Sequence, residues 1–237
     1  MITKLQILLY QKLLNFASVC GIIYREIFRS PKNRLENVDG GDNLEDYIYV
    51  IVAQTGTGPA RFFRFITKKP FNHVSLSGDV TLSEMYSFCR TYCPVPLPAT
   101  FNKEIVGKGT LGKFGYIPCE IYRIPVTKEQ KAEYNRIIRH FVDNRNIYSY
   151  NILGLLAVYM NIEWKRKKNF VCSQFVAYTF DKIGIPLEKS FCLYTPDDFR
   201  KFPNATLYYA GELNSFYDDV MSRPESRYPR TFTSKAN

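Results

Sequence analysis

Apolar positions recur at helical spacing in the first part of the chain. Between Leu5 and Phe28 they follow one another at intervals of three and four residues, and no proline interrupts them. This pattern predicts a long amphipathic helix within residues 1–34. The stretch without charge extends only from Leu13 to Tyr24. It is too short to cross a bilayer, because a spanning helix needs about 20 apolar residues.

Two placements of this helix are open. Its charged residues are mostly cationic, which would suit the interface of an anionic membrane: Lys4, Lys12, Arg25, Arg29, Lys32 and Arg34, against Glu26. A wide apolar stripe is also the ordinary mark of a helix packed on its own domain, and we favour that placement. The polar interruptions fit a secretion signal poorly. We therefore expect a cytoplasmic protein that could be peripheral on the inner face of the membrane.

The next segments have the composition of a linker and a domain. Residues 35–46 are polar, acidic and contain glycine, which predicts a linker. Residues 47–222 carry strand and helix patterns and form the expected catalytic domain. Residues 223–237, with two prolines and alternating charge, predict a flexible basic tail.

Several segments of the domain have strand patterns. Residues 47–53 are β-branched and aromatic, and a short helix is expected after them, through Ile66. Period-two alternation in 73–78, turn residues in 79–83 and extended structure in 84–88 together predict a hairpin. An irregular loop follows at Pro94, Pro96 and Pro98. Two further strands are expected, at 120–126 and 206–210.

Helical patterns fall between these strands. Thr127 is a suitable cap for a helix whose expected buried face is Tyr134, Ile137, Ile138, Phe141 and Val142. A helix over 149–160 and another over 170–183, with Asn169 as its cap, follow. A short helix begins after Thr195. The alternation of strands and helices predicts an α+β domain.

Composition narrows the class of protein. The 237 residues are 46% hydrophobic and 16% aromatic, which excludes disorder as the main state. The net charge of +10 would suit nucleic acid, anionic lipid or another polyanion. Six cysteines are few for this length and follow no dense spacing, so a reducing compartment is favoured.

One cysteine and one histidine have the positions that nucleophilic catalysis requires. Cys172 falls in the first turn of an expected helix, where unpaired N–H groups favour thiolate over thiol, although most free cysteines are small buried hydrophobes. A cysteine nucleophile generally needs an imidazole. The chain has two histidines, and His140 falls on the polar face of its helix. His73, followed at period two by Ser75 and Ser77, is therefore the candidate base.

Several spaced motifs carry a resemblance to a known family. They are Gln54-Thr55-Gly56-Thr57, Phe71-Asn72-His73-Val74-Ser75-Leu76, Glu84-Met85-Tyr86-Ser87-Phe88, Phe170-Val171-Cys172-Ser173-Gln174-Phe175-Val176-Ala177, Gly184-Ile185-Pro186 and Thr195-Pro196-Asp197-Asp198-Phe199. In this order they resemble the circularly permuted branch of the NlpC/P60 cysteine hydrolases, in which the histidine precedes the cysteine. The resemblance covers roughly residues 47–212.

The resemblance implies a permuted papain-like α+β core, an antiparallel sheet packed on helices. Cys172 would be the nucleophile and His73 the base. The third residue of such sites orients the imidazole from the following strand, and we choose Glu84, with Ser87 and Asp79 as rivals. Tyr148 would line the oxyanion site, or have only a packing role.

The implied reaction is acyl transfer through a thioester, which requires no metal or cofactor. The substrate would be an amide of a small peptide or amino-acid conjugate. An acyl lipid, as in the lecithin:retinol acyltransferase relatives, is the alternative, supported by the amphipathic helix and by the cluster Trp164-Lys165-Arg166-Lys167-Lys168. A third reading is a catalytically silent module that binds membranes or nucleic acid, but no specific nucleic-acid partner is expected.

Overall fold

A computed structural model describes residues 46–56, 69–90, 99–109 and 111–222 of the chain. The chain divides into two units, Met1–Glu36 and Asn37–Asn237, and all described residues belong to the second. The expected N-terminal helix, the short helix through Ile66, the proline loop and the C-terminal tail lie outside the described residues, as does all of the expected linker before Asp46.

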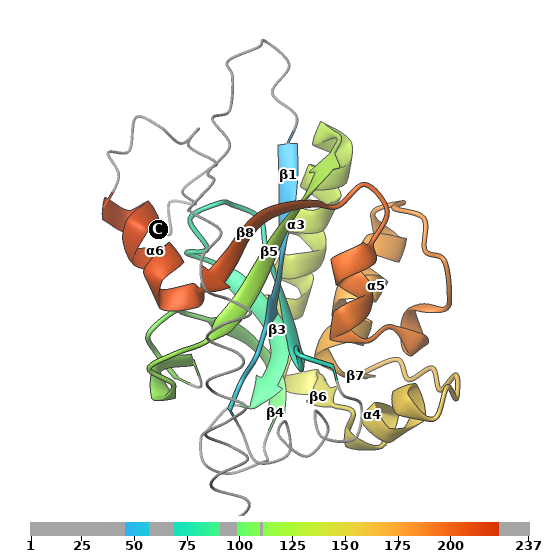
Figure 1. Cartoon of the computed structure of the whole chain (residues 1–237). Coiled ribbons are helices and arrows are strands. Elements are labelled where there is room, and N and C mark those ends of the chain that lie inside the picture. The colour runs from blue at the N-terminus through green and yellow to red at the C-terminus, as the bar shows by residue number, and fades with distance from the viewer. Residues whose placement is uncertain (1–45, 57–68, 91–98, 110, 223–237) are drawn as a thin grey trace, which may run out of the picture. The chain divides into compact units, whose positions relative to one another are not determined.

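The centre of the second unit is a six-stranded antiparallel sheet in the order β4-β3-β2-β1-β5-β8 (Figure 1). Its strands are β1 (Asp46–Ala53), β2 (His73–Ser77), β3 (Met85–Arg90), β4 (Ala99–Glu104), β5 (Pro118–Val126) and β8 (Thr206–Glu212). The predicted hairpin is present, because β2 and β3 pair antiparallel across the turn at 79–83.

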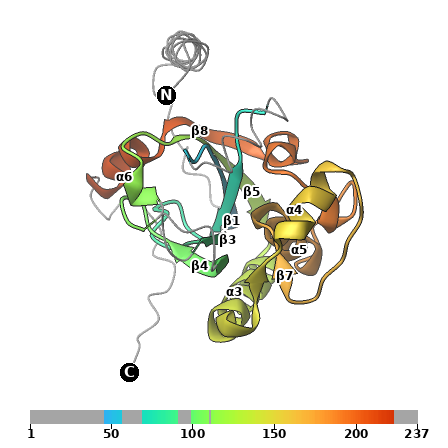
Figure 2. The ribbon, with the colours of Figure 1, turned by 90° about the horizontal axis from the view of Figure 1, so that it is seen from below.

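Four α-helices lie in the described part of the chain. They are α3 (Lys128–Asp143), α4 (Ile152–Tyr159), α5 (Cys172–Lys182) and α6 (Leu213–Ser222). Seen from below, α6 lies on one side of the sheet and α3, α4 and α5 on the other (Figure 2). The 3₁₀ segments are η1 (Leu111–Lys113), η2 (Arg145–Ile147), η3 (Phe191–Leu193) and η4 (Pro196–Lys201). Two short strands, β6 (Ser149–Tyr150) and β7 (Asn169–Phe170), pair parallel with each other. The described residues therefore form an α+β fold, as expected.

Both faces of the sheet are buried, each in its own core. Alternate residues of β1 and β2, such as Val50, Val52 and Val74, pack in one cluster with residues of α3 and α5. The intervening Ile51 and Ala53 pack in a second cluster with residues of α6. Period-two alternation thus explains why β1 is apolar from Val50 to Ala53, since each of its faces meets a hydrophobic layer there.

Helix α3 begins where the sequence predicts. The Thr127 hydroxyl accepts the backbone N–H of Gln130 at 3.2 Å, and the Gln130 side chain accepts the N–H of Thr127 at 3.0 Å. This reciprocal capping satisfies two N–H groups that the helix leaves unpaired. The expected buried face is wrong only at Val142, which is exposed.

The helix expected over 170–183 is shorter than the sequence indicated. Phe170 belongs to β7, and Val171 rather than Asn169 is the N-cap of α5. The side-chain oxygen of Gln174, in the first turn of the helix, accepts the backbone N–H of Val171 at 3.2 Å and so caps this end. Gly184 follows the helix with φ +79°, a conformation that glycine adopts without steric cost. As a result, Cys172 is the first residue of α5.

Candidate active site

His73 is the first residue of β2, and its side chain is buried. Its Nε2 lies 2.9 Å and 3.0 Å from the two carboxylate oxygens of Glu104, at the end of β4. Ser75 Oγ is 3.2 Å and Ser87 Oγ is 3.4 Å from the same nitrogen, and the Ser75 hydroxyl also donates to Glu104. Because a carboxylate only accepts, Nε2 carries a proton, and the ring is fixed in one orientation.

The charges of this pair stabilise each other. Burial disfavours the charged imidazole, but the Glu104 carboxylate and hydrogen bonds with Cys172 and Glu104 outweigh it, so the pKa of His73 lies well above its usual range. Burial likewise opposes charge on Glu104. The charge of His73 and hydrogen bonds from His73, Ser75 and Ser87 outweigh this, and the pKa of Glu104 is lowered. An imidazolium next to a carboxylate is therefore the stable state of the pair.

The structure brings Cys172 to the same imidazole. Cys172 is among the groups that raise the pKa of His73, so the two side chains lie close together. Since Glu104 occupies Nε2, Nδ1 is the ring nitrogen left for the thiol. The two residues are 99 positions apart in the sequence but meet because α5 packs on β2 and β3. Cys172 is 5% exposed.

The backbone around Cys172 favours negative charge. As the first residue of α5, it lies in the turn whose N–H groups have no partner within the helix, at the positive end of the helix dipole. The Gln174 side chain holds this end in place, because its Nε2 donates to the carbonyl of Cys192 at 3.1 Å while its oxygen caps Val171.

Glu84 does not lie where the resemblance placed it. Its carboxylate accepts from Lys103 Nζ at 2.9 Å and from the Tyr86 hydroxyl at 3.3 Å, and its side chain is 56% exposed. It is a surface acid at the end of a turn, before β3 begins. Among the described residues, Glu104 is the carboxylate that contacts His73. Of the two rivals, Ser87 contacts the imidazole, whereas Asp79 binds Thr81 and Ser83 in the turn.

The hydroxyl of Tyr148 points elsewhere too. It lies 3.1 Å from Nε2 of His140, at the exposed end of α3, and the Tyr148 ring packs on Phe141 with centroids 4.5 Å apart. Tyr148 therefore has a packing role and joins the second histidine at the surface. His140 is exposed, as its position on the polar face indicated.

A different tyrosine is coupled electrostatically to Cys172. Tyr159, the last residue of α4, is half-buried, and both burial and the nearby charge of Cys172 raise its pKa to about 12. At neutral pH it is a phenol that can donate a hydrogen bond. No motif distinguishes it from the other seventeen tyrosines of the sequence, so pattern alone could not have identified it.

The four described cysteines are free thiols. Burial, with Glu104 nearby, raises the pKa of Cys89 well above its usual range, and burial does the same for Cys119. Burial also raises the pKa of Cys192. Only Cys172 combines a helix N-terminus with an imidazole partner among these four.

In the described part of the chain, no helix is long and apolar enough to cross a membrane.

Comparisons with family models, with curated proteins and with solved structures find no match for this chain.

Proposed function

We propose that the chain is a cysteine hydrolase or acyltransferase with a circularly permuted, papain-like NlpC/P60 fold. The observation that carries this proposal is the array in which Cys172, at the start of α5, lies beside a buried imidazole whose Nε2 is held by Glu104. A thiol, a base and an orienting acceptor in this order are the parts that covalent acyl transfer requires.

In the proposed reaction, the Cys172 thiolate attacks the carbonyl carbon of an amide or ester. The tetrahedral intermediate collapses as His73 delivers its proton to the departing amine or alcohol, which leaves a thioester on Cys172. His73 is then neutral and accepts a proton from water or another acceptor, which attacks the thioester. The acyl product leaves, and the thiolate and imidazolium are restored.

The negative oxygen of the intermediate needs donors. The backbone N–H of Cys172 points out of the first turn of α5, where no helical carbonyl accepts it. Tyr159 replaces Tyr148 as the second donor in this proposal, because its pKa responds to the charge of Cys172, whereas the Tyr148 hydroxyl contacts His140. Donors of this kind act most strongly where burial excludes water.

The substrate is proposed to be an amide of a peptide or amino-acid conjugate, cleaved in the cytoplasm without a cofactor. A second candidate, an acyl lipid at a membrane surface, is favoured by the exposed apolar face of α4, the helix that carries Tyr159. A catalytically silent binding module is disfavoured. Burying a charged pair beside a thiol costs free energy, and a protein that only binds would not need such a pair.

Alkylation with limiting iodoacetamide tests the proposal. We expect Cys172 to react at least tenfold faster than any other cysteine, because thiolates are the reactive species and the imidazolium stabilises this one. His73→Ala should remove that advantage, and peptide mapping would measure it. Equal labelling of the six cysteines, or selective labelling that persists in His73→Ala, would leave the proposal without its nucleophile.

A further inference from the structure

Helix α4 exposes an unusual amount of apolar surface. Every residue from Ile152 to Tyr159 is apolar, glycine or tyrosine, and no charge occurs between Arg145 and Glu163. A helix that is apolar all round normally lies inside a protein or in a membrane. Here one face packs inward through residues such as Ala157 and Val158, whereas the opposite face is exposed.

The exposed face is continuous with the segment that follows it. Leu153 is 56% exposed, Leu156 49% and Met160 68%, and they follow one another at intervals of three and four residues on one side of the helix. Ile162 and Trp164, which come next in the chain, are exposed as well. We call the exposed side chains of residues 152–168 the α4 surface. Apolar patches of this kind on one side of a protein mark an interaction site.

The charges beside this patch are positive. Lys165 is paired with Glu163 at 2.7 Å, but Arg166, Lys167 and Lys168 are exposed and come directly after the tryptophan. The Arg166 guanidinium lies 5.6 Å from the centre of the Trp164 ring. Tryptophan beside cations, next to leucine and isoleucine side chains, is the composition of a surface that binds the interface of an anionic membrane.

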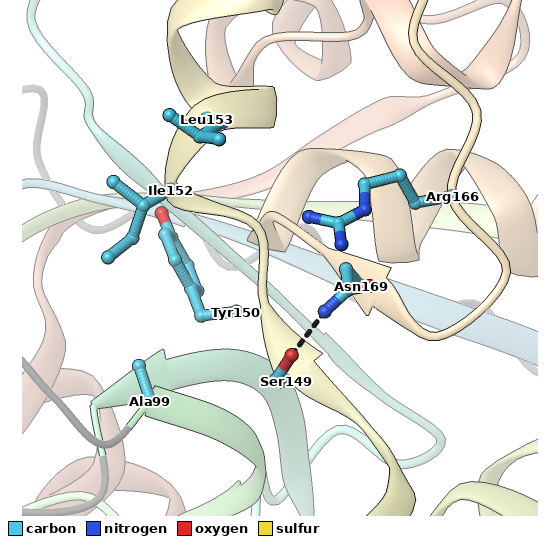
Figure 3. Close-up of a pocket in the computed structure, with 7 residues that line it drawn as sticks. All are labelled: Ala99, Ser149, Tyr150, Ile152, Leu153, Arg166 and Asn169. Carbon is cyan, nitrogen blue, oxygen red and sulfur yellow. Dashed lines mark hydrogen bonds between the residues drawn. The ribbon is translucent and has the colours of Figure 1, made fainter.

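A pocket joins the apolar and the cationic parts of the α4 surface. It has a volume of about 610 Å³ and is lined by Ala99, Ser149, Tyr150, Ile152, Leu153, Arg166 and Asn169. Figure 3 shows the Arg166 guanidinium directed toward Asn169, whose amide donates to Ser149, while Ile152 and Leu153 lie on the α4 side. A cation with amide and hydroxyl groups suits a phosphate-bearing headgroup, and the aliphatic side chains suit the start of an acyl chain.

We propose that the α4 surface docks on an anionic lipid bilayer. The apolar side chains enter the boundary between headgroups and acyl chains, and the three cations contact the lipid headgroups. Because Asn169 lines the pocket and is three residues before Cys172 in the chain, docking brings the thiol close to the lipid. This step rests on the second candidate of the proposed function, in which the substrate is an acyl lipid at that interface, but the docking itself does not require Cys172.

Trp164 provides a direct probe, because it is the single tryptophan of the chain. We expect the emission of the full chain to shift to shorter wavelength on vesicles of phosphatidylcholine with phosphatidylserine, and to be quenched by brominated acyl chains. Pure phosphatidylcholine vesicles should give a much smaller change. Cys172→Ala should behave like the wild type, so that loss of the enzyme chemistry and loss of docking are distinguishable.

Paired variants locate the surface. Leu153→Asn with Leu156→Asn should reduce vesicle binding at least tenfold, whereas Leu207→Asn with Met221→Asn, at positions 51% and 57% exposed, should not. Neutralising Arg166, Lys167 and Lys168 to Gln should weaken binding about a hundredfold. The same loss of charge at Lys108, Lys128 and Arg139 should have a smaller effect.

Two results would overturn this inference. One is vesicle binding in which Trp164 emission does not change, which would assign the contact to another part of the chain, such as residues 1–34. The other is a wild-type chain that does not distinguish anionic vesicles from neutral ones or from buffer. In that case the α4 surface is covered by this chain itself or by a second copy.

Discussion

At the residue scale, the proposed chemistry depends on the carboxylate that faces the imidazole. Glu104 donates no proton and reaches Nε2 with both oxygens, so it holds the ring and its charge together. Ser75 and Ser87 complete the carboxylate's hydrogen bonds. The positive charge of His73 therefore persists to higher pH than that of an ordinary histidine.

The pH dependence of Cys172 reactivity should change in Glu104→Gln. Glu104 raises the pKa of His73, so its neutralisation lowers that pKa. The imidazolium then loses its proton at lower pH and no longer stabilises the thiolate. The alkaline limb of the acyl-transfer pH profile should therefore move to lower pH. The measurement is the pH profile of ester hydrolysis from about pH 5 to 10. Glu84→Gln is the matched control, and an equal shift in both variants would contradict the assignment of Glu104.

The residues of the site were predictable to different degrees. Cys172 and His73 could be chosen from sequence because a helix start and a count of two histidines restricted the choice. Glu104 could not, because Asn102, Lys103 and Glu104 have low strand propensity and give little sign of β4. Glu84 was chosen for its position just after the His73 strand, but the turn leaves it at the surface, paired with Lys103.

At the element scale, an aromatic cluster connects α5 to the sheet. Phe175 of α5 is fully buried, with ring centroids 5.7 Å from Phe88 on β3, 5.3 Å from Phe101 on β4 and 5.2 Å from Phe141 on α3. These contacts fix the helix that carries Cys172 relative to the strands that carry His73 and Glu104. Such ring pairs add about 0.5–1.5 kcal/mol each to the free energy of burial.

Phe175→Ala should lower the free energy of unfolding by about 3–5 kcal/mol, because a large cavity would open among three rings. Urea unfolding followed by circular dichroism would measure the change. Val142→Ala, at an exposed position on α3, should cost less than about 1 kcal/mol. A similar small cost for both variants would show that the cluster does not hold α5 in place.

Local signals explain which elements the sequence predicted well. Thr127 marked the start of α3, and β1 was evident as a β-branched and aromatic run. By contrast, β7 was merged into the α5 pattern, since Phe170 continues the apolar periodicity of that helix. The N–H of Asn151 and the carbonyl of Phe170, 3.0 Å apart, show the tertiary pairing that overrides this periodicity.

At the scale of the whole molecule, composition indicates classes of partner, and the structure indicates a surface on which one of them would bind. The net charge of +10 would suit several polyanions. In the described residues, exposed cations and exposed apolar side chains occur together at the α4 surface, next to the only described thiol with an imidazole partner. This combination favours a lipid surface over nucleic acid. Binding to the phosphate backbone of nucleic acid depends on cations and gains nothing from exposed leucine side chains.

The central claim is that Cys172 becomes acylated. The most direct measurement is mass spectrometry of the intact chain, followed by peptide mapping, after brief acid quenching of a reaction with p-nitrophenyl acetate. The account predicts one acetyl group on Cys172 in the wild type, with no acetylation at that position and no burst of nitrophenol in Cys172→Ala. Acetylation spread over lysines and other cysteines, with an undiminished burst in Cys172→Ala, would contradict it.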